Sequence, residues 1–470
     1  MIRAFLIGIA SVLSLSGAPS AQALLATAPV NAEKAVDEIF SRWASSTPGC
    51  AVGVAVGGKP VLLKAYGMAD LEHDVRNTPE TIFESGSVAK QFTALAVQLL
   101  AGDGKLSLDD PVRKYVPELP DYKVPLTIRH MLNHTSGLRD WGSVAGIAGA
   151  PRTTRAYTHG HVLDIVSRQQ ALNFEPGSKW SYSNTGFNLA AIIVSRVSGM
   201  AFSEFSTQRI FAPLGMTRTS WRDDHTRIVK GRAIAYSETP GGYHTEMPFE
   251  NVHGNGGLLT TVGDLLIWNE NFVNPRVGNP ALLTAMGNAG RFNDGKLLEY
   301  GLGLFVHDYR GVKNINHSGS TAGYRAHLNR FPESRTSVAV LCNGSNGDAT
   351  RSANHVSDVF LGDRLKPAAS TAAAARPPAA LNPGPSASQL GVLTGNYWSD
   401  EAETMLIAAV ETTDLVLKRR PDSVIKLTAT GPDKFRGSIG TVTFIRNASG
   451  AVEALSINQD RVWDLRFLKK

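Results

Sequence analysis

The pattern of hydrophobic and polar positions places strand-like segments on either side of a long, mainly helical region. Near the N-terminal end, two apolar runs at 50–56 and 60–66 are joined by Gly57-Gly58, which predicts a β-hairpin. Further strand-like runs follow the helical region, at 300–306, 324–331 and 336–342. This order predicts an α+β fold, in which one antiparallel sheet built from both ends of the region is flanked by helices and carries a helical insertion.

Helical periodicity is clearest in the segment 87–102. Its apolar side chains recur on one face, at Phe92, Leu95, Ala96, Leu99 and Leu100. Ser87 is therefore expected in the first turn, and Lys90 follows one turn later on the same side, within reach of the hydroxyl. Free backbone N–H groups at the start of the helix would stabilise a negative charge that develops at Ser87.

Two other helical segments and one histidine bear on the later argument. The segment 31–46 is predicted to be helical, with one apolar side formed by Ala35, Ile39 and Trp43. A polar loop at 181–186 leads into another helix, so that Tyr182 and Asn184 are presented at a helix entrance. His134 has no acidic partner or nucleophile motif beside it, and we interpret it as part of a loop.

The C-terminal part of the chain has a different composition. Residues 366–389 are dominated by Pro, Ala and Ser, which indicates a linker. After it, 390–470 shows short alternating runs separated by turn residues. This pattern predicts a small all-β unit, an antiparallel sheet or barrel, that follows a larger domain at 24–365.

The first 23 residues have the three parts of a secretory signal peptide. Met1-Ile2-Arg3 precedes an apolar run at 4–17, and Ala21-Gln22-Ala23 provides small residues for cleavage after Ala23. A membrane anchor is the alternative, but the run is short for crossing a bilayer, and Leu24 in place of Cys argues against lipid modification. We expect an exported protein of a bacterial periplasm or medium, without a stable membrane anchor after cleavage.

Charge and cysteine content narrow the possible partners. The net charge is +6 and the isoelectric point about 9.2, but the basic residues are spread along the chain, which argues against nucleic-acid binding. Weak attraction to anionic cell-envelope polymers is compatible with this charge. Cys50 and Cys342 are too few for a disulfide scaffold or a thiolate zinc site. They are either two small buried side chains or, in an oxidising compartment, a single bridge.

A Ser-x-x-Lys pattern alone is weak evidence for chemistry, because the chain contains it twice. The second copy, Ser423 to Lys426, lies in a strand-like stretch, where residues three apart point to opposite faces and cannot act together. The copy at Ser87 and Lys90 gains meaning from two further patterns, Tyr182-x-Asn184 in a loop and His317-x-Gly319 beside a strand.

In this order, the three patterns resemble those of the penicillin-recognising serine hydrolases, which include class C β-lactamases, D-Ala-D-Ala carboxypeptidases, D-aminopeptidases and related esterases. Tyr-Ser-Asn replaces Ser-Asp-Asn and His-Ser-Gly replaces Lys-Thr-Gly, as in the class C and D-aminopeptidase/esterase branch. Similar supporting phrases occur at 132–138, 213–216 and 256–261. The resemblance covers about 31–360, and the C-terminal part resembles the lipocalin-like barrel of some members.

The resemblance implies a role for each residue. Ser87 would be the nucleophile, and either Lys90 or Tyr182 would take its proton; the sequence leaves this choice open. The backbone N–H groups of Ser87 and Ser320 would hold the oxyanion. Asn184 would bind the amide of the substrate.

Two residues of the third pattern bear on specificity. Gly319 has no side chain to obstruct the substrate. His317 in place of Lys is neutral for much of the time near pH 7, which weakens any requirement for a substrate carboxylate.

We therefore expect an exported serine hydrolase that forms an acyl-serine intermediate on D-amino-acid peptides or amides, esters or β-lactams. The alternative is a binding or sensing protein on the same fold that acylates without turnover or binds peptidoglycan fragments. No cofactor is implied, and no H-E-x-x-H motif or His/Asp cluster suggests a metal. The expected partners are a small-molecule or peptide substrate and cell-envelope peptidoglycan.

Overall fold

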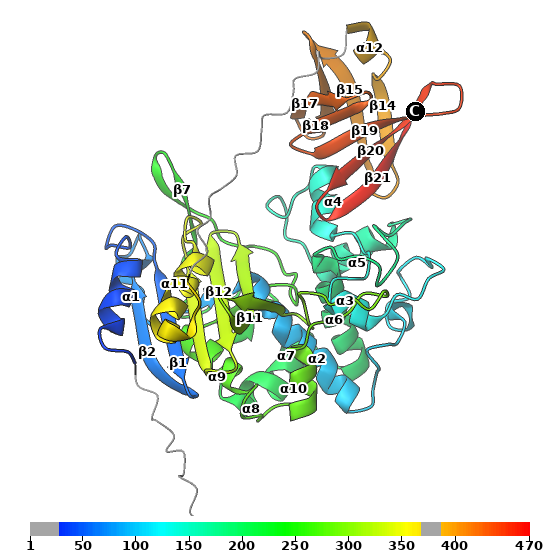
Figure 1. The fold of residues 1–470 in the computed structure, drawn as a ribbon. Helices are drawn as coiled ribbons and strands as arrows, with labels where there is room; N and C mark the ends of the chain where they lie inside the picture. Colours follow the sequence, from blue (N-terminus) through cyan, green and yellow to red (C-terminus); the bar gives the residue numbers. More distant parts are fainter. Residues whose placement is uncertain (1–27, 368–386) are drawn as a thin grey trace, which may run out of the picture.

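The computed structural model describes residues 28–367 and 387–470, which form an α+β body and a closed β-barrel (Figure 1). The main sheet has six strands in the order β10-β11-β12-β13-β1-β2, all antiparallel. Its strands are β1 (Cys50–Val56), β2 (Lys59–Tyr66), β10 (Phe305–Tyr309), β11 (Val312–Thr321), β12 (Tyr324–Phe331) and β13 (Thr336–Cys342). The two ends of the region thus share one sheet, and the predicted fold class is confirmed.

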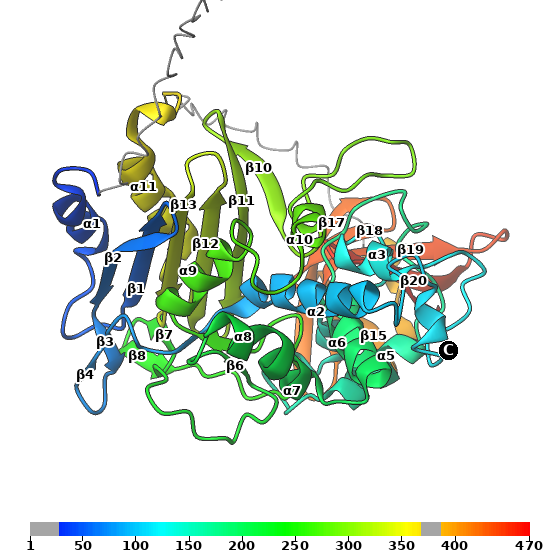
Figure 2. The same ribbon diagram turned by 90° about the horizontal axis from the view of Figure 1, so that it is seen from below.

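The centre of this sheet is buried on both faces, because side chains alternate between two layers of helices. One face of β1 and β13 packs on α1 (Ala32–Phe40) and α11 (Ala349–Leu361). The other face packs on α9 (Val262–Glu270), and it belongs to the same core as α2 (Lys90–Gly102) (Figure 2).

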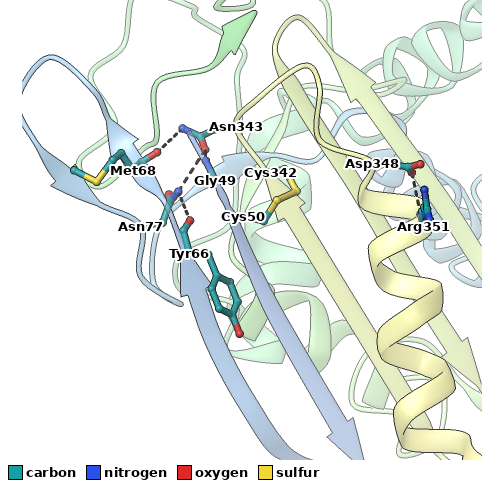
Figure 3. The surroundings of a disulfide bond; sticks show 9 residues. All are labelled: Gly49, Cys50, Tyr66, Met68, Asn77, Cys342, Asn343, Asp348 and Arg351. Atoms are coloured by element: carbon teal, nitrogen blue, oxygen red, sulfur yellow. Dashed lines mark hydrogen bonds between the residues drawn. A yellow bond between two sulfur atoms is a disulfide. The ribbon is translucent and has the colours of Figure 1, made fainter. Parts of the chain in front are cut away.

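Cys50 and Cys342 lie opposite each other on β1 and β13 and form a disulfide, so the bridged alternative is the observed one (Figure 3). Beside it, the Asn343 side chain accepts a hydrogen bond from Gly49 N–H and donates one to the Met68 carbonyl oxygen. The disulfide and this asparagine hold the C-terminal end of β13 against the start of β1, 292 residues apart in the chain.

The helical insertion surrounds α2, which is buried on nearly all sides and packs against α6 (Asn184–Ser198) and α10 (Pro280–Met286). The other helices are α3 (Ile128–Leu132), α4 (Trp141–Ala148), α5 (His159–Ser167), α7 (Phe202–Ser206) and α8 (Ala212–Leu214). The short strands are β3 (Met68–Asp70), β4 (Val75–Arg76), β5 (Phe83–Glu84), β6 (Ser220–Trp221), β7 (Tyr236–Thr239), β8 (Gly242–Thr245) and β9 (Leu258–Thr260). Single turns of other helix types occur at Gly86–Ala89, Val112–Lys114, Thr207–Phe211 and Gly362–Arg364.

Across the described ranges, no single helix is long and apolar enough to span a membrane. One pair of helical segments meets the length and hydropathy criteria together, Asn184–Ser198 and Phe202–Leu214, but the pair is bent by 83°.

Two of the predicted elements differ from the structure. The helix predicted at 31–46 ends at Phe40 and buries Ala32, Val36 and Phe40, although Trp43 still packs on the same core. The strand predicted at 300–306 begins at Phe305, and a full strand, β11, follows it. The sequence obscured β11 because its middle is polar: the side chain of Asn316 donates to Asn314, whose amide donates to Asn329 on β12.

The C-terminal body is an eight-stranded antiparallel barrel closed between β14 and β21. Its elements are α12 (Ala387–Gly391), β14 (Gly395–Ser399), β15 (Thr404–Glu411), β16 (Asp414–Arg419), β17 (Ser423–Gly431), β18 (Lys434–Gly437), β19 (Gly440–Arg446), β20 (Val452–Gln459) and β21 (Val462–Lys469). The second Ser-x-x-Lys copy lies in β17, as expected, with Lys426 exposed and Ile425 buried. The predicted signal peptide, 1–23, and most of the predicted linker, 366–389, lie outside the described residues.

The barrel packs on the helical insertion near α4 (Figure 1). Arg139 is buried and forms an ion pair with Glu401 of the barrel, at 2.5 Å between Nη1 and Oε2. From β16, Arg419 Nη1 donates to the carbonyl oxygens of Gly146 and Ile147, in the last turn of α4. The Gly146 carbonyl oxygen also accepts from the Gly149 N–H at the end of the helix, and the positive charge of Arg419 suits the negative end of the helix dipole.

Candidate active site

Ser87 and Lys90 lie where the segment Gly86–Ala89 runs into α2. Ser87 is in a single 3₁₀ turn directly before the α-helix, not in the first α-helical turn as predicted, and Lys90 is the first residue of α2. The two side chains still meet, at 3.0 Å between Lys90 Nζ and Ser87 Oγ. Local helical geometry is therefore sufficient to bring this pair together.

The amine of Lys90 is completely buried and has three polar neighbours. Nζ lies 2.9 Å from Asn184 Oδ1 and 2.7 Å from the carbonyl oxygen of Asn255, in addition to the Ser87 hydroxyl. Burial is the main cause that lowers the Lys90 pKa well below its ordinary value, and the Arg461 charge lowers it further. A neutral amine has two N–H donors and one lone pair. The two amide oxygens can accept both N–H groups, which leaves the lone pair to accept the Ser87 hydroxyl proton.

The Tyr182 ring lies close to two basic groups. Lys90 Nζ lies 4.8 Å from the centre of the ring and Arg461 Cζ lies 4.7 Å from it. Burial raises the pKa of the phenol, and this outweighs the lowering by a hydrogen bond with Ser87 and by the Arg461 charge. Desolvation therefore dominates the Tyr182 pKa. Tyr182 is a neutral phenol at neutral pH, and the directions of the two shifts favour Lys90 as the proton acceptor.

His317 lies within β11 and carries no charge at neutral pH. Its Nδ1 lies 2.6 Å from the carbonyl oxygen of Ser318, which can only accept, so Nδ1 carries the proton. Nε2 lies 3.0 Å from the Tyr300 hydroxyl and accepts its hydrogen bond. Burial lowers the His317 pKa to about 3, with a smaller contribution from Lys90. Both ring nitrogens are thus engaged with the protein.

β11 packs so closely on the segment Gly86–Ala89 that only glycine fits on each side of the contact. A Cβ at Gly319 would lie 2.0 Å from Ser85 O and 3.1 Å from Ser87 N. A Cβ at Gly86, which has φ +51°, would lie 2.6 Å from Ser320 N. The backbone nitrogens of Ser87 and Ser320 therefore face the same junction, where an oxyanion hole needs two donors. Their use as such a hole remains a prediction.

These groups open into a pocket of about 540 Å³ that is also lined by one residue of the barrel, Arg461. The predicted residues in its wall are Ser87, Tyr182, Asn184, His317, Gly319 and Ser320. Lys90 is reached through Ser87 and Asn184, so the structure brings all seven residues together. The wall also contains Arg152, Arg325 and Arg461, none of which the sequence analysis identified.

Arg461 comes from the turn between β20 and β21, at the tip of a barrel hairpin. Its carbonyl oxygen accepts a hydrogen bond from Asp140 N–H, and Asp140 in turn accepts from the Asn184 N–H. The carbonyl oxygen of the preceding residue, Asp460, accepts from the Ser181 hydroxyl. The hairpin therefore contacts the Tyr182–Asn184 loop directly, and no local pattern in the sequence indicates this.

The pocket wall has few candidate metal ligands. A group of side chains that could hold an ion, found within the described residues, is Asp70, Glu72 and His73 in the β3–β4 hairpin. None of these three lines the pocket.

Comparison with known proteins agrees with this arrangement. The family model described as Beta-lactamase matches residues 33–360. The D-aminopeptidase of Brucella anthropi is 28% identical over 315 residues, which are 67% of this chain and 59% of that enzyme. The structure of the octameric penicillin-binding protein homologue from Pyrococcus abyssi has a TM-score of 0.62 at 24% identity and covers 94% of this chain and 99% of that one.

A second solved structure is the D-amino acid amidase of Ochrobactrum anthropi SV3 complexed with L-phenylalanine amide. It has a TM-score of 0.61 at 23% identity and covers 71% of this chain and 99% of the amidase. At this level of identity both structural comparisons establish the fold. The family match covers more than half of the chain and contains the Ser87, Lys90 and Tyr182 cluster, and the protein therefore belongs to the Beta-lactamase family of serine hydrolases.

Proposed function

We propose that the protein is an exported hydrolase that cleaves amide or ester bonds through an acyl intermediate on Ser87. The observation that carries the proposal is the buried Lys90 amine, whose two amide-oxygen neighbours leave its lone pair for the Ser87 hydroxyl. A serine hydroxyl is a weak nucleophile unless a base contacts it, and a lysine serves as that base only where burial keeps it neutral.

The reaction then follows from the positions of these groups. Ser87 Oγ bonds to the carbonyl carbon of the substrate while its proton passes to Lys90 Nζ, and the oxyanion is held by the N–H groups of Ser87 and Ser320. The bond to the leaving group breaks, and the leaving group takes the proton by way of the Tyr182 phenol. A water molecule then attacks the acyl carbon and gives a proton to Lys90, and Ser87 recovers its proton as the acyl group leaves.

We further propose that preferred substrates carry a carboxylate near the scissile bond. Charge in the pocket supports this, because Arg152 is paired with Glu250, whereas in the described part of the chain Arg461 forms no ion pair. His317 is neutral and has no free nitrogen, so the positive charge in the pocket wall comes from Arg461 of the barrel hairpin and from Arg325, which among the described residues donates only to backbone carbonyl oxygens. Candidate substrates are peptides or amides of D-amino acids with a free carboxyl group, carboxylated esters and β-lactams.

The test combines labelling with turnover. Wild type, Ser87→Ala and Ser423→Ala are incubated with a fluorophosphonate probe and with nitrocefin, p-nitrophenyl esters and D-amino-acid p-nitroanilides. We expect Ser87→Ala to lose both labelling and turnover, and Ser423→Ala, the serine of the other Ser-x-x-Lys copy, to keep both. Turnover by Ser87→Ala would refute the proposal. Labelling of Ser87 without product release from any substrate would instead identify a penicillin-binding or sensing protein.

The proposed location is the bacterial periplasm or the medium. The signal-peptide pattern of the first 23 residues and the Cys50–Cys342 disulfide both support export, because disulfides persist in oxidising compartments. Fractionation of cells that express the full chain tests this directly. We expect the protein in the periplasmic or extracellular fraction, and recovery in the cytoplasm would refute export.

A further inference from the structure

His134 contacts the Tyr182–Asn184 loop more closely than its position in the sequence suggests. It is buried, and its backbone has φ +62°, in the left-handed region that is uncommon for residues other than glycine, although histidine adopts it more often than most. Its ring centre lies 4.2 Å from that of Tyr182, with 36° between the ring planes. The sequence alone indicates only that this histidine is part of a loop, and the proposed reaction does not use it.

Two hydrogen bonds connect His134 to the residues on either side of Tyr182. Ser181 N–H donates to the carbonyl oxygen of His134, at 3.1 Å. Ser183 N–H donates to His134 Nδ1, at 3.2 Å. One residue thus holds the backbone before and after Tyr182 and also packs against its ring.

The second bond requires a neutral imidazole, because Nδ1 can accept only when it carries no proton. Burial lowers the His134 pKa well below its ordinary value, and the nearby Lys90, His317 and Arg461 lower it further. The surroundings of the ring therefore keep the acceptor available. The Tyr182, Phe187 and Tyr300 rings pack around it, and they limit its rotation.

We propose that His134 is a positioning residue, which fixes the Tyr182 phenol against Ser87 by holding the loop on both sides. This inference depends on the proposed acyl-serine chemistry. A displacement of about 1 Å at a catalytic group can lower turnover by about 100-fold. The loss of His134 should therefore reduce kcat and leave substrate affinity nearly unchanged, since His134 is absent from the pocket wall.

Two variants separate the acceptor from the rest of the side chain. His134→Asn and His134→Gly both tolerate the left-handed backbone and both lack the ring. Only asparagine keeps an oxygen acceptor at the position of Nδ1. kcat and KM are measured for both with an uncharged p-nitrophenyl ester, and each rate is divided by the number of sites that a fluorophosphonate labels. Thermal unfolding of each variant reports its stability separately.

We expect His134→Gly to lose about 100-fold in kcat with KM changed by less than about threefold, and His134→Asn to stay within about tenfold of wild type. The alkaline limb of the His134→Gly pH–rate profile should move to lower pH, because water that reaches a loosened Tyr182 removes the burial that raises its pKa. Equal kcat values for the two variants, or an unchanged limb in His134→Gly, would overturn the proposal. If His134→Gly does not fold, His134→Asn alone provides the test, and a loss of about 100-fold in its kcat overturns the proposal. Labelling at Ser87 in both variants shows that the acyl-serine chemistry itself still holds.

Discussion

The barrel hairpin places the positive charge of Arg461 close to the proposed base, Lys90. The effect of removing this charge on the Lys90 pKa can be calculated. In Arg461→Gln, the guanidinium is replaced by a neutral amide. Arg461 and Lys90 lie 4.7 and 4.8 Å from the centre of the Tyr182 ring, so they are at most about 9.5 Å apart. At an effective dielectric constant of about 20, two positive charges at this distance repel by about 1.7 kcal/mol.

The sign of the effect follows from the role of Lys90. The Arg461 charge disfavours the ammonium form and lowers the Lys90 pKa, so its removal raises that pKa. Lys90 accepts a proton only when neutral, that is, above its pKa. A repulsion of about 1.7 kcal/mol therefore corresponds to a shift of the acidic limb of kcat/KM to higher pH by about one pH unit, while kcat/KM on the plateau directly above this limb stays unchanged.

The assay is hydrolysis of p-nitrophenyl butyrate across the pH range at low ionic strength, where screening is weakest. This ester is uncharged, so the loss of a contact between Arg461 and a substrate carboxylate does not contribute to the measured shift. Arg436→Gln is the matched control, because Arg436 is an exposed barrel arginine outside the pocket wall. An acidic limb that moves by less than about 0.3 pH unit in Arg461→Gln would show that Lys90 does not titrate as the base, or that solvent screens the two charges.

The same variant tests the proposed substrate class. A hydrogen bond to a charged group contributes about 1.5–3 kcal/mol, which corresponds to a loss of roughly 10- to 150-fold in kcat/KM. We expect this loss for p-nitrophenyl hydrogen succinate at a pH on the plateau, and little change for its methyl ester. An equal loss for both esters would refute carboxylate binding by Arg461.

Two further predictions concern stability. Glu84, the last residue of β5, forms a completely buried ion pair with Arg222, with Nε 2.8 Å from Oε2. Glu84→Gln should lower the free energy of unfolding by about 3–5 kcal/mol, because the buried guanidinium then keeps only the more distant Glu250 carboxylate, at 3.9 Å. Urea unfolding measures this, and a loss below about 1 kcal/mol would contradict it. Replacement of Cys50 and Cys342 by serine should cost about 2–5 kcal/mol in the same assay, and a reductant should destabilise wild type but not this double variant.

The sequence by itself determined what depends on neighbours along the chain. Ser87 and Lys90 are three residues apart, and any helical turn brings their side chains together, so the helix pattern was sufficient to predict the pair. The alternating apolar runs predicted the strands, and β1, β2, β12 and β13 lie where these runs are. The polar middle of β11 gave no such signal, because its side chains form hydrogen bonds inside the fold.

Tertiary structure decided what depends on residues far apart in the chain. The pairing of β1 with β13 placed Cys50 opposite Cys342, and the barrel hairpin brought Arg461 to the Tyr182 ring. The protonation states of Lys90 and Tyr182 follow from desolvation, which no local pattern encodes, because burial depends on every element that packs around the site. The helix thus placed the proposed nucleophile beside the proposed base, and the folded surroundings set the protonation states on which that proposal depends.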